Sequence, residues 1–410
     1  LDGKDHQSCQ FLSKRAPDES HEFTWKEVTT TRGGELAEIL GDQLRSVDSL
    51  VVKGYVNDKD FHAMWDASLY GYLSVINLKN AVLENNAVPD TAFFHENEQY
   101  EGSSHEIFYY IGLRKIILPE GLEKIGEGAF YQASALRQVN FPSTLRYIGD
   151  FAFNATKLEM NQLVIPEGVE EINQYAFAFC RKLKAQVILP STIKKIGEWA
   201  FYGCPITSIN LPEGLESLGS LAFWDCDLRE VSIPSSCHEF NEGWQFGFNR
   251  NLEKMHLPEG MTEIPDHFAV DCFRLREVNF PHTLKHIGEK AFSLCISLKN
   301  VELPLGMQSL GEEAFSELEA LEQIVFPASM KSLGKNSCSY WKNIKRIYCA
   351  AMEPPVCDPT DGGVFSGYDF PDGLNTPVVY VPKGTINKYK DTSRNCMGWE
   401  KFWNYVEIDP

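Results

Sequence analysis

A proline that recurs about every 23 residues constrains this 410-residue chain more than any other feature. An Ala-Phe pair follows most of these prolines at the tenth and eleventh places, so the period carries a whole pattern. A fixed period of ~20 to 50 residues is typical of proteins that stack one small unit many times. The sequence therefore predicts a repeat array. The ten prolines are Pro119, Pro142, Pro166, Pro190, Pro212, Pro234, Pro258, Pro281, Pro304 and Pro327.

Each repeat combines a strand pattern with a turn pattern. The consensus is L-x-x-[VI]-x-[FL]-P-x-[GT]-L-x-x-I-G-x-x-A-F-x-x-C. Apolar and polar residues alternate before the proline, which predicts a short strand that ends where proline removes a ladder donor. The stretch after the proline is too short for an independent helix and carries glycine, so we expect a helical turn or an irregular arc there. Stacked repeats would place parallel strands about 4.8 Å apart over one continuous core.

The flanks of the array resemble caps. Weaker copies of the strand pattern appear from residue 47 to residue 118, and helix-like apolar spacing covers residues 35–44 and 58–69. A cap is needed because an open solenoid end exposes core and strand edge. We expect one continuous solenoid domain, divided into a flexible leader (1–25), an N-terminal cap with degenerate repeats (26–118), regular repeats (119–349) and a C-terminal cap (350–410).

The charge of the chain excludes several classes of partner. Asp and Glu number 57 and Lys and Arg 38, which gives a net charge of −19. Nucleic acids and anionic membrane surfaces are recognised through basic residues, so neither is an expected partner. No apolar run approaches the ~18 residues that a membrane span needs.

The sequence carries none of the common catalytic motifs. A G-x-S-x-G turn, a Walker loop, an H-E-x-x-H helix and a C-x-x-C pair are all missing from it. We therefore expect no enzyme, no cofactor and no metal site.

The cysteines follow the repeat. Five of them stand fourteen places after a proline, and we expect a column of buried free thiols, since Cys behaves as a small core hydrophobe. A disulfide between Cys349 and Cys357 across a short loop stays open as an alternative. The five cysteines are Cys180, Cys204, Cys226, Cys272 and Cys295.

The repeat unit resembles that of the BspA-like leucine-rich-repeat proteins, surface proteins common in Bacteroides-type bacteria. The segment Cys349-Ala-Ala-Met-Glu-Pro-Pro and the segment Val379-Tyr-Val-Pro-Lys-Gly384 also resemble their closing region. The resemblance covers roughly residues 47–410. It implies a leucine-rich-repeat solenoid of the α/β class, rich in β, with a curved right-handed array of short parallel strands. It also implies export to the extracellular side or the bacterial cell surface, often with a lipid anchor, which here would precede residue 1.

Two surfaces are candidates for binding. The first is the row of outward residues along the strands, which is mostly uncharged; its exposed Ile and Val suggest a protein-docking strip, whereas ordinary strand propensity is the alternative. The row contains Ile117, Asn140, Val164, Ile188, Asn210, Ser232, His256, Asn279, Glu302, Val325 and Tyr348. Its candidate binding residues are Asn140, Asn210, His256, Asn279, Glu302 and Tyr348.

The second surface is aromatic. Trp199, Tyr202, Trp224 and Trp244 are expected near one another on the outer side of neighbouring repeats. Flat rings there would stack on sugars or anchor a protein. The alternative is that these rings pack between repeats.

Three functions compete. The leading hypothesis is a non-enzymatic, monomeric surface protein that binds a protein or glycan through its repeats. The second is an enzyme whose site lies in the irregular repeats at 240–268, where Phe240-Asn-Glu-Gly-Trp-Gln-Phe246 and Ile264-Pro-Asp-His-Phe268 depart from the consensus. Its site would need Glu242 and the histidines His238, His256 and His267 to converge in a pocket. The third is a structural spacer.

Overall fold

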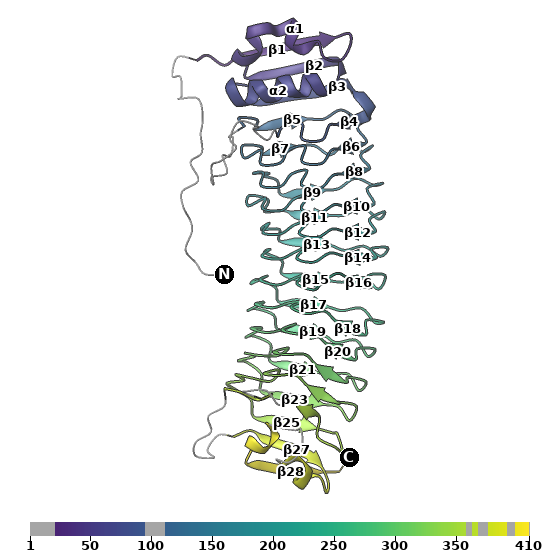
Figure 1. Ribbon diagram of the computed structural model, residues 1–410, viewed down its shortest axis with the longest axis vertical. Helices are drawn as coiled ribbons and strands as arrows, with labels where there is room; N and C mark the ends of the chain where they lie inside the picture. The colour runs from purple at the N-terminus through teal and green to yellow at the C-terminus, as the bar shows by residue number, and fades with distance from the viewer. Residues whose placement is uncertain (1–20, 95–110, 358–362, 368–375, 392–397, 410) are drawn as a thin grey trace, which may run out of the picture. The chain divides into compact units, whose positions relative to one another are not determined.

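The computed structural model describes residues 21–94, 111–357, 363–367, 376–391 and 398–409. Two compact units divide the chain, Leu1–Ile193 and Lys194–Pro410. Both are parallel β-solenoids, in which strands of the same kind follow one another turn by turn (Figure 1). Residues 1–20 of the predicted leader lie outside the described residues, and Trp25 already begins a strand.

The first unit opens with turns that contain helices. Their order is β1 (Trp25–Thr30), α1 (Leu36–Leu40), η1 (Gly41–Ser46), β2 (Ser49–Val56), α2 (Asp58–Tyr70) and β3 (Val75–Leu83). Asn57 starts α2 because its side chain accepts a hydrogen bond from the N–H of Lys59, while Asp60 accepts one from the N–H of Asn57. These helices confirm the helix-like spacing at 35–44 and 58–69.

The remaining turns carry two ladders of strands. The first ladder holds the strands predicted before the ten prolines: β5 (Lys115–Ile117), β7 (Gln138–Val139), β9 (Gln162–Val164) and β11 (Gln186–Ile188) in the first unit, and β13 (Ser208–Asn210), β15 (Glu230–Ser232), β17 (Lys254–His256), β19 (Glu277–Asn279), β21 (Asn300–Glu302) and β23 (Gln323–Phe326) in the second. It continues beyond the last of these prolines with β25 (Arg346–Cys349), β27 (Val378–Pro382) and β28 (Asn404–Ile408). The leucine-rich-repeat fold class is thus confirmed.

The second ladder is a finding that the sequence pattern did not predict. It consists of two-residue strands, most of which end at an Ile or Leu that precedes a glycine, where a helical turn or an arc was expected. Its members are β4 (Ala87–Val88, after η2, Glu84–Asn86), β6 (Lys124–Ile125), β8 (Tyr147–Ile148) and β10 (Glu171–Ile172) in the first unit, and β12 (Lys195–Ile196), β14 (Ser217–Leu218), β16 (Glu239–Phe240), β18 (Glu263–Ile264), β20 (His286–Ile287), β22 (Ser309–Leu310), β24 (Ser332–Leu333) and β26 (Val356–Cys357) in the second. The short helices α3 (Ile386–Tyr389) and η3 (Trp399–Lys401) lie in the C-terminal part of the second unit.

The Ala-Phe stretch forms the irregular arc. Phe151 and Ala155, two residues on either side of the buried Phe153, have φ angles of 55° and 58°. This alternation turns the N–H groups of Phe151, Phe153 and Ala155 toward the next turn, where they meet carbonyls at 2.9, 2.8 and 2.8 Å. The arcs are therefore held by a third set of bonds between turns, which explains why no helix forms there.

A phenylalanine column fills the core. Phe153 stacks between Phe130 and Phe177 with ring centroids 5.1 and 5.3 Å apart. In the second unit, Phe223 stacks in the same way between Phe201 and Phe246, at 5.5 and 5.6 Å. These buried, stacked aromatic rings contribute to the cohesion between turns.

The predicted thiol column lies beside these rings. The nine cysteines among the described residues are all free and buried. Cys180 donates to the carbonyl of Phe153 at 3.2 Å, and Cys272 donates to that of Phe246 at 3.3 Å. Burial raises the pKa of the Cys272 thiol to about 12, so the group is neutral at physiological pH.

The alternative of a disulfide between Cys349 and Cys357 is not formed in the structure, where both thiols are free. The two residues lie on different ladders, in β25 and β26. Cys349 accepts a hydrogen bond from the hydroxyl of Tyr389 at 3.2 Å, while Cys357 donates to the carbonyl of Pro355 at 3.5 Å. Each thiol therefore has a hydrogen-bond partner of its own.

The irregular repeats at 240–268 interrupt the second ladder. The strand order stops at β16 and a separate sheet begins at β18, whereas the first ladder continues from β15 through β17 to β19. The ring of Phe268 lies edge-on to Phe246, with 77° between their planes, because its turn is one residue shorter before the phenylalanine. The break changes packing locally and leaves the first ladder intact.

Candidate functional site

The outward side chains of β15, β17 and β19 form a charged section of the first ladder. Lys254 contacts Glu277 at 3.0 Å, and His256 contacts Glu230 at 3.3 Å. The hydrogen bond to Glu277 raises the pKa of Lys254. His256, a predicted binding residue, thus lies exposed on this section but is paired with a carboxylate of the preceding strand. The charged side chains of this section are therefore paired with one another.

Two predicted binding residues brace the fold. The amide of Asn279 accepts from the N–H of Leu257 at 2.8 Å and donates to its carbonyl at 3.0 Å. Asn140 makes the same two bonds to Leu118, at 2.7 and 3.0 Å. Both amides replace ladder bonds next to a proline, where the strand has ended. Their polar groups are already used within the protein.

The outward side chains of β23, β25, β27 and β28 form an apolar section, which we call the tyrosine row: Val325, Tyr348, Tyr380 and Val406. The strand register aligns these four residues directly, with Glu302 of β21 before them. The rings of Tyr348 and Tyr380 stack with centroids 4.4 Å apart and 11° between their planes. Val325 is 39% exposed and Val406 is 42% exposed.

Sequence reasoning found only part of this row. Tyr348 and Val325 belong to the predicted strand row, whereas Tyr380 and Val406 come from the C-terminal segment, where the proline period has ended. The apolar–polar alternation over residues 378–381 predicts a late strand, but the period does not say which repeat it pairs with. Only the register of β27 against β25 places Tyr380 beside Tyr348.

The predicted aromatic cluster is a packing arrangement. Trp199 lies against Tyr202 with ring centroids 4.5 Å apart, and Trp224 lies against Trp244 at 5.2 Å. Trp244 also stacks on His267 at 3.6 Å with 8° between the rings. Trp224 covers the main chain of Gly247, where a Cβ would come within 2.1 Å of the indole. Only Trp244 and His267 stack face to face, whereas the planes of the other two ring pairs are tilted by 41° and 58°.

The residues of the alternative enzymatic site do not converge. His238 contacts the carbonyl of Ser236 at 2.6 Å, and His256 contacts Glu230 on the first ladder. His267 packs on Trp244, and burial lowers its pKa. Within the described residues, no hydrogen bond or ion pair joins any two of Glu242, His238, His256 and His267, and no group of three or more His, Cys, Asp and Glu residues is arranged to hold a metal ion.

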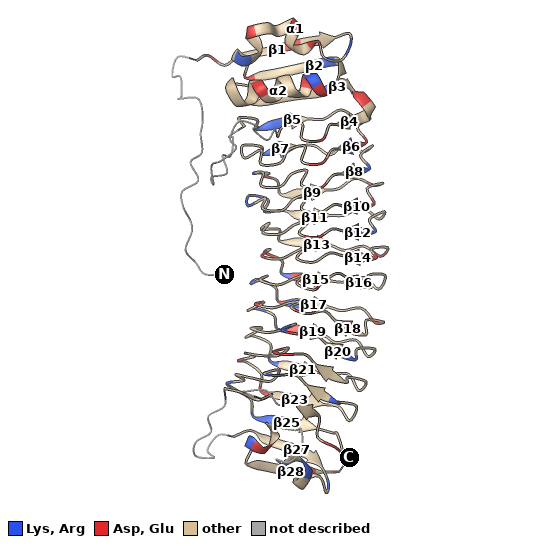
Figure 2. Cartoon of the chain, viewed as in Figure 1, with Lys and Arg blue, Asp and Glu red and all other residues tan. Residues whose placement is uncertain are grey.

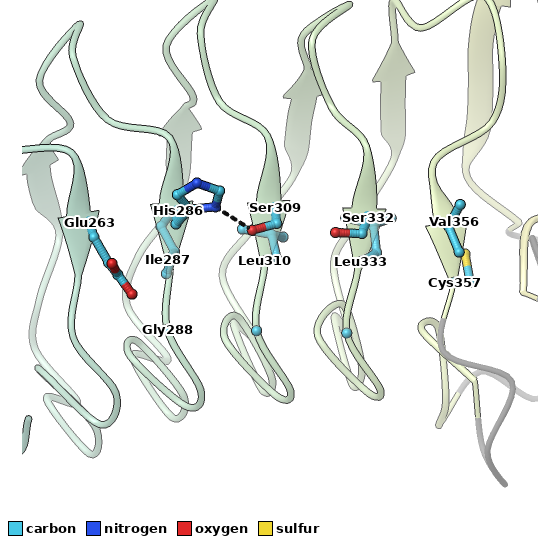
Figure 3. A pocket seen from close by; sticks show the side chains of 12 residues that line it. Glu263, His286, Ile287, Gly288, Ser309, Leu310, Ser332, Leu333, Val356 and Cys357 are labelled. Atoms are coloured by element: carbon cyan, nitrogen blue, oxygen red, sulfur yellow. Dashed lines mark hydrogen bonds between the residues drawn. The ribbon is translucent and has the colours of Figure 1, made fainter. Parts of the chain in front are cut away.

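A groove of about 500 Å³ runs across the second ladder from β18 to β26 (Figure 3). Small residues, among them Gly311, Ser309 and Ser332, form its floor. His286 and Ser309 share a hydrogen bond of 2.7 Å between Nδ1 and Oγ. The groove could not be predicted, because the sequence pattern does not indicate the second ladder.

The histidine–serine pair lacks the rest of a nucleophilic site. The N–H of Ser309 donates to Lys285 and that of Gly311 donates to Ile287, so neither can stabilise an oxyanion. Glu263 is in register with His286 but makes no hydrogen bond to it in the part of the chain that the structure describes. The groove therefore has room for a ligand, but its histidine–serine pair lacks the oxyanion donors and the carboxylate partner of a nucleophilic site.

The sequence matches the model of the BspA-type leucine-rich-repeat region in three overlapping stretches, residues 103–187, 184–285 and 267–352, with six copies. This chain belongs to the BspA-type leucine-rich-repeat family. Family members are built from repeats and are generally non-enzymatic, and bacterial surface proteins are common among them. None of the described helices of this BspA-type chain is long and apolar enough to cross a membrane.

Solved structures with a similar fold come from several bacteria. A leucine-rich-repeat protein from Bacteroides ovatus is 23% identical, with a TM-score of 0.46, covering 74% of this chain and 82% of its own. A leucine-rich cell surface protein from Faecalibacterium prausnitzii is 20% identical, with a TM-score of 0.36 and coverage of 69% and 84%. The pneumococcal vaccine antigen PcpA is 18% identical, with a TM-score of 0.41 and coverage of 89% and 80%. A search of curated proteins finds no match.

Proposed function

We propose that this BspA-type chain is an exported, non-enzymatic cell-surface protein that binds a partner protein through its tyrosine row. The observation that carries the proposal is the stacked pair Tyr348 and Tyr380 between two exposed valines. Contiguous exposed apolar area is uncommon on soluble proteins and marks interaction sites. Tyrosine is enriched at the residues that dominate binding energy.

The ring geometry favours a protein over a sugar. Stacked rings at 4.4 Å cover one face of each other, and the strand register places a valine beside each ring on its other side. A sugar needs an open ring face for its C–H groups, whereas a protein surface packs against edges and hydrogen-bonds to hydroxyls. The charged residues also fit a protein partner better than nucleic acid, since Lys and Arg are scattered among Asp and Glu in both units (Figure 2).

A binding screen tests this function. The purified chain is assayed for saturable binding to a panel of host extracellular-matrix proteins and to a glycan array, beside the double variant Tyr348→Ala/Tyr380→Ala. We expect binding to a protein of the panel that the double variant weakens by at least ~10-fold, as for interface anchors. The matched control is Tyr147→Ala, which removes a tyrosine that is 42% exposed on the second ladder of the first unit.

Three outcomes count against the proposal. Equal affinity of the wild type and the double variant would remove the tyrosine row from the interface. Binding to glycans alone would replace the protein partner by a sugar. The absence of any saturable binding across both panels would favour the spacer hypothesis.

A further inference from the structure

Strand β1 forms one edge of the sheet β1-β2-β3-β5-β7 in the first unit, and it pairs only with β2. The pairing is parallel over all six residues, with Trp25 opposite Ser49 and Thr30 opposite Gly54. The outer side of β1 therefore offers main-chain groups that no strand among the described residues covers.

The register identifies those groups. The N–H of Ser49 donates to the carbonyl of Thr24 at 3.2 Å. In a parallel pair the residues of one strand turn their main-chain groups alternately toward and away from the neighbour. Lys26 and Val28 thus bond to β2, whereas the N–H and C=O groups of Trp25, Glu27 and Thr29 point away from it. Within the described part of the chain, no hydrogen bond satisfies these outward groups.

This edge lacks two of the usual protections. Monomeric proteins block an edge strand with proline, a bulge, charged side chains (lysine above all) or a covering segment; of these, β1 carries the charged residues Lys26 and Glu27. The sequence of β1, Trp-Lys-Glu-Val-Thr-Thr, contains no proline, and its register with β2 has no bulge. The carboxylate of Glu27 is held by Lys53 at 2.6 Å on the sheet face, so it does not guard the edge.

Two large aromatic side chains lie beside the edge. Trp25 is 63% exposed and Phe23 is 70% exposed. Trp25, Glu27 and Thr29 share one face of the strand because side chains alternate. An added strand would gain apolar contact with Trp25 on that face in addition to its main-chain bonds.

We propose that the β1 edge binds an extended segment of a partner polypeptide, which adds to the sheet as a further strand. A row of alternating donors and acceptors along one line is matched by another extended main chain, and apolar residues at alternate positions of that segment would meet Trp25. The site is separate from the tyrosine row, which belongs to the second unit.

The size of the edge favours a peptide segment over a second copy of this chain. Six residues span about 20 Å at ~3.3 Å per residue. Stable dimers bury about 1,200 to 2,000 Å² in total, which a single short strand pair does not supply. A peptide instead adds its own side-chain contacts to the same main-chain bonds.

A peptide selection tests the proposal at the level of a single main-chain N–H group. A random 12-residue phage-displayed library is panned against the purified wild-type chain, and the enriched peptides are then measured against Glu27→Pro and Glu27→Ala. Proline removes an N–H that points outward and spares the bonds to β2, as edge strands allow. Alanine removes the carboxylate and keeps the N–H. We expect Glu27→Pro to weaken binding at least ~10-fold and Glu27→Ala to bind like the wild type.

Separate controls address the folding of the proline variants and the identity of the molecule that occupies the edge. Thermal unfolding identifies a Glu27→Pro variant that fails to fold, in which case Thr29→Pro, which removes the next outward N–H, replaces it. Peptides that bind the proline and wild-type chains equally, or a library that yields no enriched peptide, would overturn the proposal. A concentration-dependent dimer in light scattering that the proline variant abolishes would assign the edge to a second copy instead. Tyr348→Ala/Tyr380→Ala is expected to keep peptide binding, which separates this site from the tyrosine row.

Discussion

The charged section and the tyrosine row are two stretches of the same ladder with the same main chain and opposite outward chemistry. On β15, β17 and β19, Lys254 meets Glu277 and His256 meets Glu230. On β23, β25, β27 and β28, exposed valines border two stacked tyrosines. Since the backbone and the core are alike beneath both, the fold does not dictate the difference. The contrast leaves two explanations of the apolar residues in the tyrosine row, strand propensity and, as we propose, a partner.

The largest expected effect is the loss of stability when a buried residue beneath either section is truncated. It tests whether the core is alike beneath the two sections. Met255, under the charged section, and Ile324, under the tyrosine row, are both fully buried. We expect Met255→Ala and Ile324→Ala each to lower the free energy of unfolding by about 2 to 5 kcal/mol, as core truncations do. Denaturant unfolding measures this cost. A large cost at one position and none at the other would show that the two scaffolds differ.

A smaller loss of stability is expected when an outward residue that hydrogen-bonds to the preceding turn is truncated, compared with an outward residue at the equivalent position of another strand. Asn279→Ala removes two hydrogen bonds and leaves the main chain of Leu257 unpaired, so we expect a loss of about 1 to 3 kcal/mol. Ser232→Ala, at the equivalent outward position of β15, is the matched control and should change stability by no more than about 0.5 kcal/mol. Equal melting temperatures for the two variants would contradict the bracing role of Asn279.

The smallest expected effect concerns the exposed ion pair. Lys254→Gln is expected to leave the melting temperature unchanged within measurement error, because exposed pairs contribute little and salt screens them. Thermal unfolding at low and high ionic strength measures this directly. A clear destabilisation at low salt only would show that the charged section contributes more to the fold than its exposure suggests.

The sequence predicts the parts of this fold that repeat. The strands before each proline and the thiol column from Cys180 to Cys295 follow from period and alternation, and the helix at 58–69 follows from its helix-like apolar spacing. The second ladder does not, because a two-residue strand such as Lys124–Ile125 is too short to show an alternating pattern. The alternative of a disulfide is not formed, because Cys349 and Cys357 lie on different ladders although they are close in sequence.

The candidate sites depend on contacts that the period does not encode. Tyr348 is visible in the sequence as a strand-row residue, but its stacking on Tyr380 depends on the pairing of β27 with β25. Asn140 and Asn279 look like free polar residues until their bonds to the preceding turn are seen. The open edge of β1 was hidden as well, since residues 1–25 were expected to be a leader and Trp25 begins the strand.

The central claim is that the tyrosine row binds a partner and the charged section does not. The most direct measurement is the affinity of the wild-type chain for the matrix protein that the panel identifies, compared with Tyr348→Ala/Tyr380→Ala and with the matched pair Lys254→Ala/His256→Ala. The account predicts a loss of at least ~10-fold for the tyrosine variant and an unchanged affinity for the charged-section variant. An unchanged affinity for the tyrosine variant, or an equal loss for both, would contradict it.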